Sequence, residues 1–272
     1  MPMKLDEARD QVARANRIVA NEGVLDAFGH ISMRHPNDPN RYLLSRSRAP
    51  ELIQPEDVLE FTLDSEPVKP PTVRLYGERV IHGEIYKARP EVMAVCHHHA
   101  ASILPFCISG ADLKPVYHLG ATMGGAVPFW DQRDDFGNTT LIVGKPEEGA
   151  SLARALGGNW MVLMRRHGAT VAGRSLQELV FRTIYTTRNA GMQIQAHSLG
   201  HVSPLNAEET QLAGDYNLQP SPVARAWEYW NVRLDKAEGA WRPETRKAAP
   251  SKSRKPAKAA KPARKKTAKR RR

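Results

Sequence analysis

Residues 77–101, GERVIHGEIYKARPEVMAVCHHHAA, decide the fold, because a helix-like stretch is followed at once by a strand-like one. The stretch from about Glu78 to Ala88 is typical of a helix, and the run from Val92 to His97 is short and apolar, like a buried strand. Segments of both kinds lie on either side. The predicted helices are 5–22, 147–156 and 175–198, and the predicted strands are 30–34, 42–45, 58–63, 140–143, 160–165 and 170–172. This mixture predicts an α/β fold with helices covering a central mixed sheet.

Three histidines are the candidate metal ligands. Along an extended strand end, side chains two residues apart point the same way, so His97 and His99 can face one point while His98 faces away. His167 follows another strand-like run and precedes a glycine. Three imidazoles bind Zn²⁺, Mn²⁺ or Fe²⁺ and leave coordination positions open for substrate. The pattern predicts one divalent ion per subunit that stabilises negative charge on a substrate oxygen, although core histidines are the simpler explanation of any one of them.

Glu78 and His82 are four residues apart on the predicted helix and therefore share one of its faces. Glu78 is a candidate fourth ligand or general acid or base beside the metal, and the alternative is a solvated acid at a helix start. His82 is predicted either to orient Glu78 or to pack in the core.

The composition divides the chain in two. Of the 272 residues 41% are apolar, which is enough for one substantial core. Residues 246–272 contain fourteen Lys and Arg and no acid, so the formal charge of +11 less these 14 leaves −3 for the remainder. We expect a catalytic domain over 1–243 and a disordered Lys/Arg/Ala/Pro-rich tail over 244–272. Weak binding of nucleic acid or anionic surfaces is an expectation for the tail alone, with a solubilising extension as the alternative.

The sequence shows no targeting or membrane-spanning signal, and this predicts the cellular compartment. The start, MPMKLDEARDQ, has no apolar core of a signal peptide, and no eighteen apolar residues run together. The two cysteines, Cys96 and Cys107, are too few for a disulfide framework. We expect a cytoplasmic protein without a membrane span.

Residues 77–101, together with LMRRHGATVAG at 163–173, resemble the class II aldolase/adducin family, and the resemblance runs from FGHISMR at 28–34 to about residue 200. Members of that family bind a metal through an H-x-H pair and a distant HG histidine, with an acid/base glutamate nineteen residues before the pair. The resemblance assigns these roles to His97, His99, His167 and Glu78. It implies an α/β/α sandwich, usually a tetramer with active sites at subunit interfaces.

The chain departs from the sugar-phosphate aldolases of the family where they hold phosphate. It has GH at 29–30, SRSR at 45–48 and YG at 76–77. Arginine forks suit carboxylates, so this predicts an unphosphorylated substrate that bears carboxylates, fixed by His30, Ser32, Arg46 and Arg48. An Asp or Glu network that occupies the arginines structurally is the alternative.

The combination FGHIS, SRSRAPE, GERVIHGEIY and RRHGATV is similar to the branch of metal-dependent decarboxylases that act on hydroxylated phthalates and on a hydroxy-methyl-pyridine-dicarboxylate. Arg166 stands where relatives more commonly have a small residue, next to a ligand. The predicted function is decarboxylation of a small carboxylated aromatic substrate, and Tyr185 is a candidate acid for a neighbouring site. The alternatives are an aldolase on a non-phosphorylated hydroxy acid, an iron-dependent oxygenase and an adducin-like interaction module without catalysis.

Overall fold

The computed structural model describes residues 3–240. The predicted basic tail at 244–272 and its boundary with the catalytic domain lie outside the described residues, and both stay predictions. None of the helices in the described part of the chain has the length and apolar character needed to span a bilayer.

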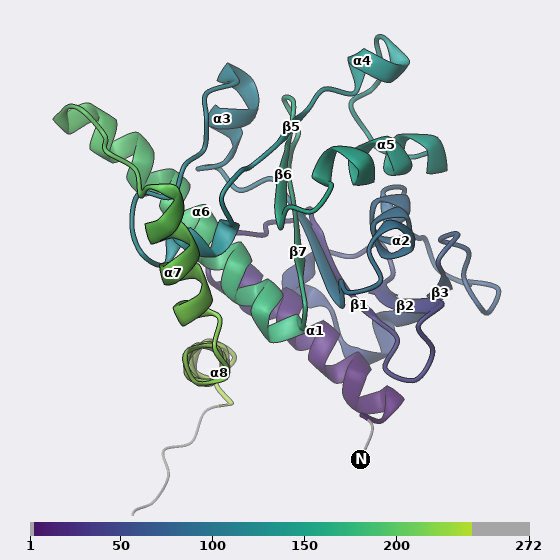
Figure 1. The fold of residues 1–272 in the computed structure, drawn as a ribbon. Helices are drawn as coiled ribbons and strands as arrows, with labels where there is room; N and C mark the ends of the chain where they lie inside the picture. Colours follow the sequence, from purple (N-terminus) through teal and green to yellow (C-terminus); the bar gives the residue numbers. More distant parts are fainter. Residues whose placement is uncertain (1–2, 241–272) are drawn as a thin grey trace, which may run out of the picture. The chain divides into compact units, whose positions relative to one another are not determined.

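The strands of this part form one sheet of seven in the order β3-β2-β1-β4-β7-β6-β5 (Figure 1). Neighbouring strands are antiparallel, except that β5 and β6 are parallel. The strands are β1 His30–Arg34, β2 Arg41–Ser45, β3 Val58–Thr62, β4 Ala94–His98, β5 Phe129–Trp130, β6 Met161–Met164 and β7 Gly168–Gly173. The strand that carries His97, β4, therefore lies at the centre of the sheet.

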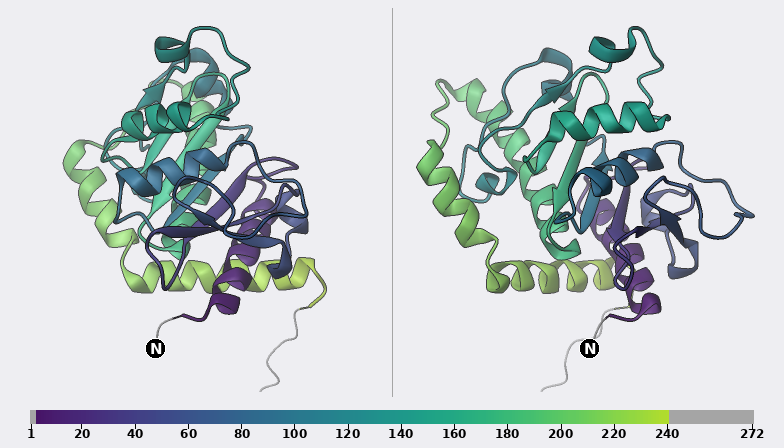
Figure 2. Two further views of the ribbon diagram at one scale, coloured as in Figure 1. Left: turned by 90° about the vertical axis from the view of Figure 1, so that its right-hand side faces the viewer. Right: turned by 45° about the vertical axis from the view of Figure 1, so that its right-hand side comes forward.

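Helices cover both faces of this sheet, which confirms the predicted fold class. One hydrophobic cluster joins the sheet to α1, α6 and α8, and a second joins the other face to α2 and α5 (Figures 1 and 2). The α-helices are α1 Leu5–Asn21, α2 Arg79–Ala88, α3 Leu104–Ser109, α4 Arg133–Phe136, α5 Pro146–Leu156, α6 Leu176–Leu199, α7 Ala207–Asn217 and α8 Pro220–Ala237.

The alternation of side chains along β4 decides which layer each histidine enters. Ala94 and Cys96 pack in the cluster of α1 and α6, whereas Val95 packs in the cluster of α2 and α5. Since alternate residues point to opposite faces, His97 faces the α2 side and His98 the α1 side. Burying Val95 fully contributes about 1.5–3 kcal/mol of hydrophobic stabilisation, so register is strongly fixed here.

Two features of the fold differ from the sequence prediction. The predicted strand at 140–143 is wrong, because this segment is a loop in which Leu141 has a left-handed φ of 67°. Two of its amides donate to side chains: Leu141 N–H donates to Thr139 Oγ1, and Val143 N–H donates to Glu78 Oε1. The short strand β5, which pairs with β6, was not predicted, because two residues carry too little pattern.

Candidate metal centre

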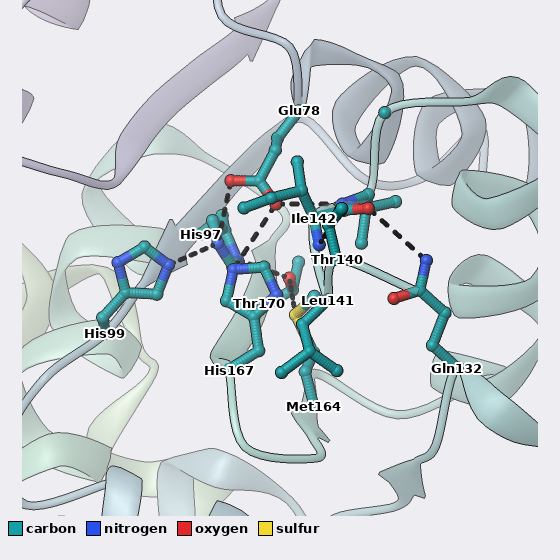
Figure 3. Close-up of polar contacts among 12 residues, drawn as sticks. Glu78, His97, His99, Gln132, Thr140, Leu141, Ile142, Met164, His167 and Thr170 are labelled. Atoms are coloured by element: carbon teal, nitrogen blue, oxygen red, sulfur yellow. Dashed lines mark hydrogen bonds and ion pairs between the residues drawn. The ribbon is translucent and has the colours of Figure 1, made fainter. Parts of the chain in front are cut away.

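Four side chains from separate elements converge at one end of the central strands (Figure 3). Glu78 immediately precedes α2, His97 lies in β4, His99 follows β4, and His167 lies in the turn between β6 and β7. His97 Nε2 lies 2.9 Å from His99 Nε2 and 3.7 Å from Glu78 Oε2, and His167 Nε2 lies 3.4 Å from Glu78 Oε1. One donor atom from each residue lies within 4.8 Å of all the others.

These separations fit a single divalent ion. Donor atoms at about 2.0–2.2 Å from an ion in tetrahedral geometry lie roughly 3.3–3.6 Å apart, close to the observed spacings. The buried His167 Nδ1 has no hydrogen-bond partner in the described residues, whereas His97 Nδ1 lies 3.3 Å from Thr170 Oγ1. If the Nδ1 proton is donated to Thr170, the His97 Nε2 lone pair is free for the ion. The donor set suits Zn²⁺, Mn²⁺ or Fe²⁺ and does not distinguish among them.

Burial sets the charges of the cluster. It lowers the pKa of His97 well below its ordinary value and lowers the pKa of His167 to about 4. It raises the pKa of Glu78 to about 7, although the Val143 amide acts in the opposite direction. At neutral pH the imidazoles are therefore uncharged, which is the form that binds metal, and Glu78 exchanges a proton readily.

A tight turn between β6 and β7 places His167. Arg166 adopts a left-handed φ of 53° and its N–H donates to the Cys107 carbonyl at 2.8 Å. The Arg166 side chain is exposed and is not among the residues that line the cavity beside the cluster. Gly168 then passes so close to β4 that an added Cβ would lie 2.3 Å from the His98 carbonyl oxygen and 2.8 Å from His99 Cδ2.

We expect Gly168→Ala to lower both stability and metal content, because the new methyl group forces apart the backbone beside His99. The cost of such overpacking is about 1–3 kcal/mol of unfolding free energy. Denaturant unfolding and metal analysis of the purified protein measure the two effects. Gly158→Ala is the matched control, since a Cβ there meets nothing within 4 Å. Equal behaviour of the two variants would contradict this role of Gly168.

A cavity of about 250 Å³ opens beside the cluster. Its wall includes His30, Arg48, Tyr76, Glu78 and His99. The Tyr76 hydroxyl donates to the Arg48 carbonyl, and its ring lies 4.5 Å from that of His30, centroid to centroid. The cavity is large enough for a small aromatic acid placed against the candidate ligands.

The two arginines predicted to bind carboxylates both contact Asp57. Arg46 Nε donates to Asp57 Oδ1 at 2.5 Å, and Arg48 Nη1 donates to Asp57 Oδ2 at 2.7 Å. Burial raises the pKa of Asp57, but the hydrogen bonds from Arg46, the Gln54 amide and Arg48 outweigh it and hold the pKa below its ordinary value. The alternative in which an acid occupies the arginines therefore matches the structure. Arg48 still lines the cavity, whereas Arg46 is not among the lining residues.

Of the two alternatives considered for His82, packing in the core matches the structure, because His82 is fully buried and both of its ring nitrogens contact groups other than Glu78. Its Nε2 lies 2.6 Å from His30 Nδ1, and its Nδ1 lies 2.6 Å from Ser32 Oγ. Ser32 is fully buried and is not among the residues that line the cavity, and its contact with substrate stays a prediction. His30 remains at the cavity wall.

Tyr185 lies on α6 and packs against Phe181 and Trp230, with ring centroids 4.6 and 5.7 Å away. Within the described chain Tyr185 is therefore a core-packing residue. A role as an acid in a neighbouring subunit stays a prediction.

Three residues of the site were missed in the sequence. Thr170 contacts His97 from the facing strand, Val143 contacts Glu78 from the loop, and Tyr76 shapes the cavity. Tyr76 was noted in the sequence only as part of the departure at 76–77, two residues before Glu78, and was given no role. The contact of Val143 had no local signal, because it joins residues 65 positions apart.

The chain is similar in sequence to known proteins. Residues 10–194 match the family model described as the class II aldolase and adducin N-terminal domain. The chain is 35% identical over 237 residues to the decarboxylase tropJ of Talaromyces stipitatus, covering 78% of this chain and 88% of that protein. It is 26% identical over 260 residues to a 3,4-dihydroxyphthalate decarboxylase of Arthrobacter keyseri, covering 88% and 98%.

Solved structures support the fold. An L-fuculose 1-phosphate aldolase from Glaciozyma antarctica PI12 superposes with a TM-score of 0.72 at 20% identity, covering 86% of this chain and 90% of that one. At this identity the likeness concerns the fold alone.

Proposed function

Because the chain belongs to the class II aldolase and adducin family, we propose that it is a divalent-metal-dependent carboxy-lyase acting on a hydroxylated aromatic or pyridine carboxylate. Its relatives include decarboxylases and an aldolase, so a lyase of one of these two types is supported. The observation that carries the proposal is the cluster itself, in which the Glu78 carboxylate lies within 4 Å of His97 Nε2 and of His167 Nε2 and one donor atom of each of the four residues lies within 4.8 Å of the others.

His97, His99 and His167 would hold the ion. When bound, a divalent ion acts as a Lewis acid that stabilises negative charge on substrate oxygens. The three imidazoles contribute no charge of their own at neutral pH, so the net positive charge of the ion is retained for the substrate. Burial of the cluster lowers the local dielectric constant and strengthens that attraction.

Glu78 would supply the proton. When the carbon–carboxylate bond breaks, its electron pair stays on the ring carbon, carbon dioxide leaves, and that carbon must be protonated. Burial raises the pKa of the Glu78 carboxyl to about 7, and Glu78 lines the cavity. The Val143 amide holds one of its oxygens in place at 3.2 Å. The alternative role is that of a fourth ligand to the ion, which would require the ionised carboxylate.

Arg48 is the arginine that would meet the substrate. We expect Arg48→Gln to raise KM for a dicarboxylate roughly tenfold, with a smaller change for a monocarboxylate, because one charge-assisted hydrogen bond is lost. Arg46→Gln is the matched control, since Arg46 shares Asp57 but is not among the residues that line the cavity. The same rise in KM in both variants would show that Asp57, and not the substrate, is the partner that matters.

The decisive experiment measures products. Metal-loaded protein is incubated under nitrogen with ortho-hydroxy aromatic and pyridine dicarboxylates, and carbon dioxide release is recorded. Release supports a carboxy-lyase. A carbonyl pair from a non-phosphorylated hydroxy acid would support an aldolase, and turnover that requires oxygen would support an iron-dependent oxygenase. Protein purified without chelator that holds far less than one ion per chain would favour an adducin-like module. The homotetramer, the cytoplasmic location and the binding of anionic polymers by residues 244–272 stay predictions.

A further inference from the structure

A buried line of four polar side chains runs from the cavity wall into the core; we call it the His30–Tyr86 line. His30 Nδ1 lies 2.6 Å from His82 Nε2, and His82 Nδ1 lies 2.6 Å from Ser32 Oγ. Ser32 Oγ lies 2.7 Å from the Tyr86 hydroxyl. Each of these side chains is at most 2% exposed. The function proposed above leaves His82, Ser32 and Tyr86 without a role.

One arrangement of protons gives each of the three hydrogen bonds within the line a donor and an acceptor. Burial lowers the pKa of His82 to about 3, so its ring is neutral with one N–H and one bare nitrogen. The 2.6 Å contact between His82 Nε2 and His30 Nδ1 needs a proton on one of these nitrogens and a lone pair on the other. Within residues 3–240, Ser32 Oγ is the hydrogen-bond acceptor found for the Tyr86 O–H. Tyr86 therefore donates to Ser32, because a buried O–H without an acceptor is costly.

The direction of the Tyr86–Ser32 hydrogen bond fixes the direction of the other two. Ser32 has a single proton, and with Tyr86 donating to its oxygen that proton goes to His82 Nδ1. His82 then carries its own proton on Nε2 and donates it to His30 Nδ1. His30 is left with its proton on Nε2. The opposite order would leave the Tyr86 O–H without an acceptor.

His30 Nε2 is available to a ligand. The ring lines the cavity together with Glu78 and His99, and the described residues offer Nε2 no hydrogen-bond partner. The rings of Tyr76 and His97 lie 4.5 and 5.4 Å away, centroid to centroid, and restrict rotation of the imidazole. A bare Nε2 would point a lone pair at an anion, whereas a protonated one donates a hydrogen bond to it.

We propose that the His30–Tyr86 line holds the proton of neutral His30 on Nε2, where it is a fixed hydrogen-bond donor to a carboxylate oxygen of the substrate. His82, Ser32 and Tyr86 are then positioning residues that act through His30. The identity of the ligand rests on the proposed function, but the direction of the line does not.

The first test locates the protons directly. Full-length, zinc-loaded protein labelled with ¹⁵N in histidine is studied by NMR, and the signals are assigned with His30→Gln and His82→Gln. We expect both rings to be protonated on Nε2 and bare on Nδ1. A proton on Nδ1 of His30 would overturn the proposal, whether or not the protein releases carbon dioxide.

The second test measures binding of phthalate, an aromatic dicarboxylate, by calorimetry. We expect His30→Leu to weaken binding roughly tenfold or more, and His30→Gln to retain most of it because the amide keeps a donor near the place of Nε2. Metal content should be unchanged in both variants. Equal loss of binding in His30→Gln and His30→Leu would contradict the donor role.

The positioning residues predict a graded series. Ser32→Ala leaves His82 Nδ1 without its partner in either tautomer, so the preference for one of them falls and phthalate binding weakens several-fold. Tyr86→Phe has a smaller effect, because the Ser32 hydroxyl can still donate to His82. Tyr42→Phe is the control: this buried hydroxyl contacts Ser65 and the Arg79 carbonyl, outside the line. Weaker binding in Tyr42→Phe than in Ser32→Ala would refute the series. If the NMR and binding results are as expected but no substrate yields carbon dioxide, the proposed reaction is wrong and the proposed role of the His30–Tyr86 line still stands.

Discussion

Replacement of His99 by alanine is expected to remove the metal and abolish turnover. His99 Nε2 lies 2.9 Å from His97 Nε2, so both atoms would contact the same ion, and two imidazoles bind it far more weakly than three. A bound ion contributes several kcal/mol of charge stabilisation, so its loss should lower kcat by roughly 10³-fold or more. Elemental analysis should give well under 0.1 ion per chain, against about one in the unchanged protein.

The matched variant is His98→Ala. His98 is fully buried on the opposite face of β4, and its Nδ1 accepts a hydrogen bond from the Ala100 N–H at 3.3 Å. We expect His98→Ala to lower the unfolding free energy by about 1–3 kcal/mol, because side-chain volume and a hydrogen bond are lost, and to leave the metal content largely intact. Loss of metal to the same extent in both variants would contradict the alternation of side chains on which the metal set depends.

Replacement of Glu78 by glutamine is expected to lower kcat by roughly 10²–10⁴-fold while metal content stays near one ion per chain. The amide keeps an oxygen that can accept the Val143 N–H, so the local structure is preserved, but it has no acidic proton to give to the ring carbon. Incorporation of deuterium from heavy water into the product reports on that proton transfer in the unchanged enzyme.

The same variant separates the two roles left open for Glu78. A ligand to the ion would lose metal on this change, as His99→Ala does, because an amide oxygen is a weaker donor than a carboxylate. A proton donor would lose rate alone. Metal content and kcat measured on one preparation therefore distinguish the roles, and unchanged kcat would exclude both.

Part of the candidate metal set was open to prediction from the sequence, because the geometry of the His97/His99 pair is local. The spacing of two residues between His97 and His99 places both side chains on one face of any extended strand. His167 was recognisable from the glycine that follows it. Because Gly168 has no Cβ, the start of β7 can lie close to the end of β4. The helix–strand order around Glu78 likewise indicated the layered fold, which the structure confirms.

The partners of the remaining polar groups were decided by the tertiary structure. Arg48 contacts Asp57, which is the last residue of the short helical segment Pro55–Asp57. His82 contacts His30 and Ser32 because α2 lies against β1. The loop at 140–143 was predicted as a strand because its residues are apolar and β-branched, yet its amides bind Glu78 and nearby side chains.

The physical reason for this division is the range of the interactions. Strand alternation and helix spacing follow from backbone geometry and act over a few residues, so the sequence by itself determined the layered fold and the faces on which the histidines lie. The choice of hydrogen-bond partner depends on which groups are brought within about 3 Å by packing of segments far apart in the chain. Only the folded protein therefore decided that His30 faces the cavity, that His82 lies behind it, and that Asp57 holds the arginines.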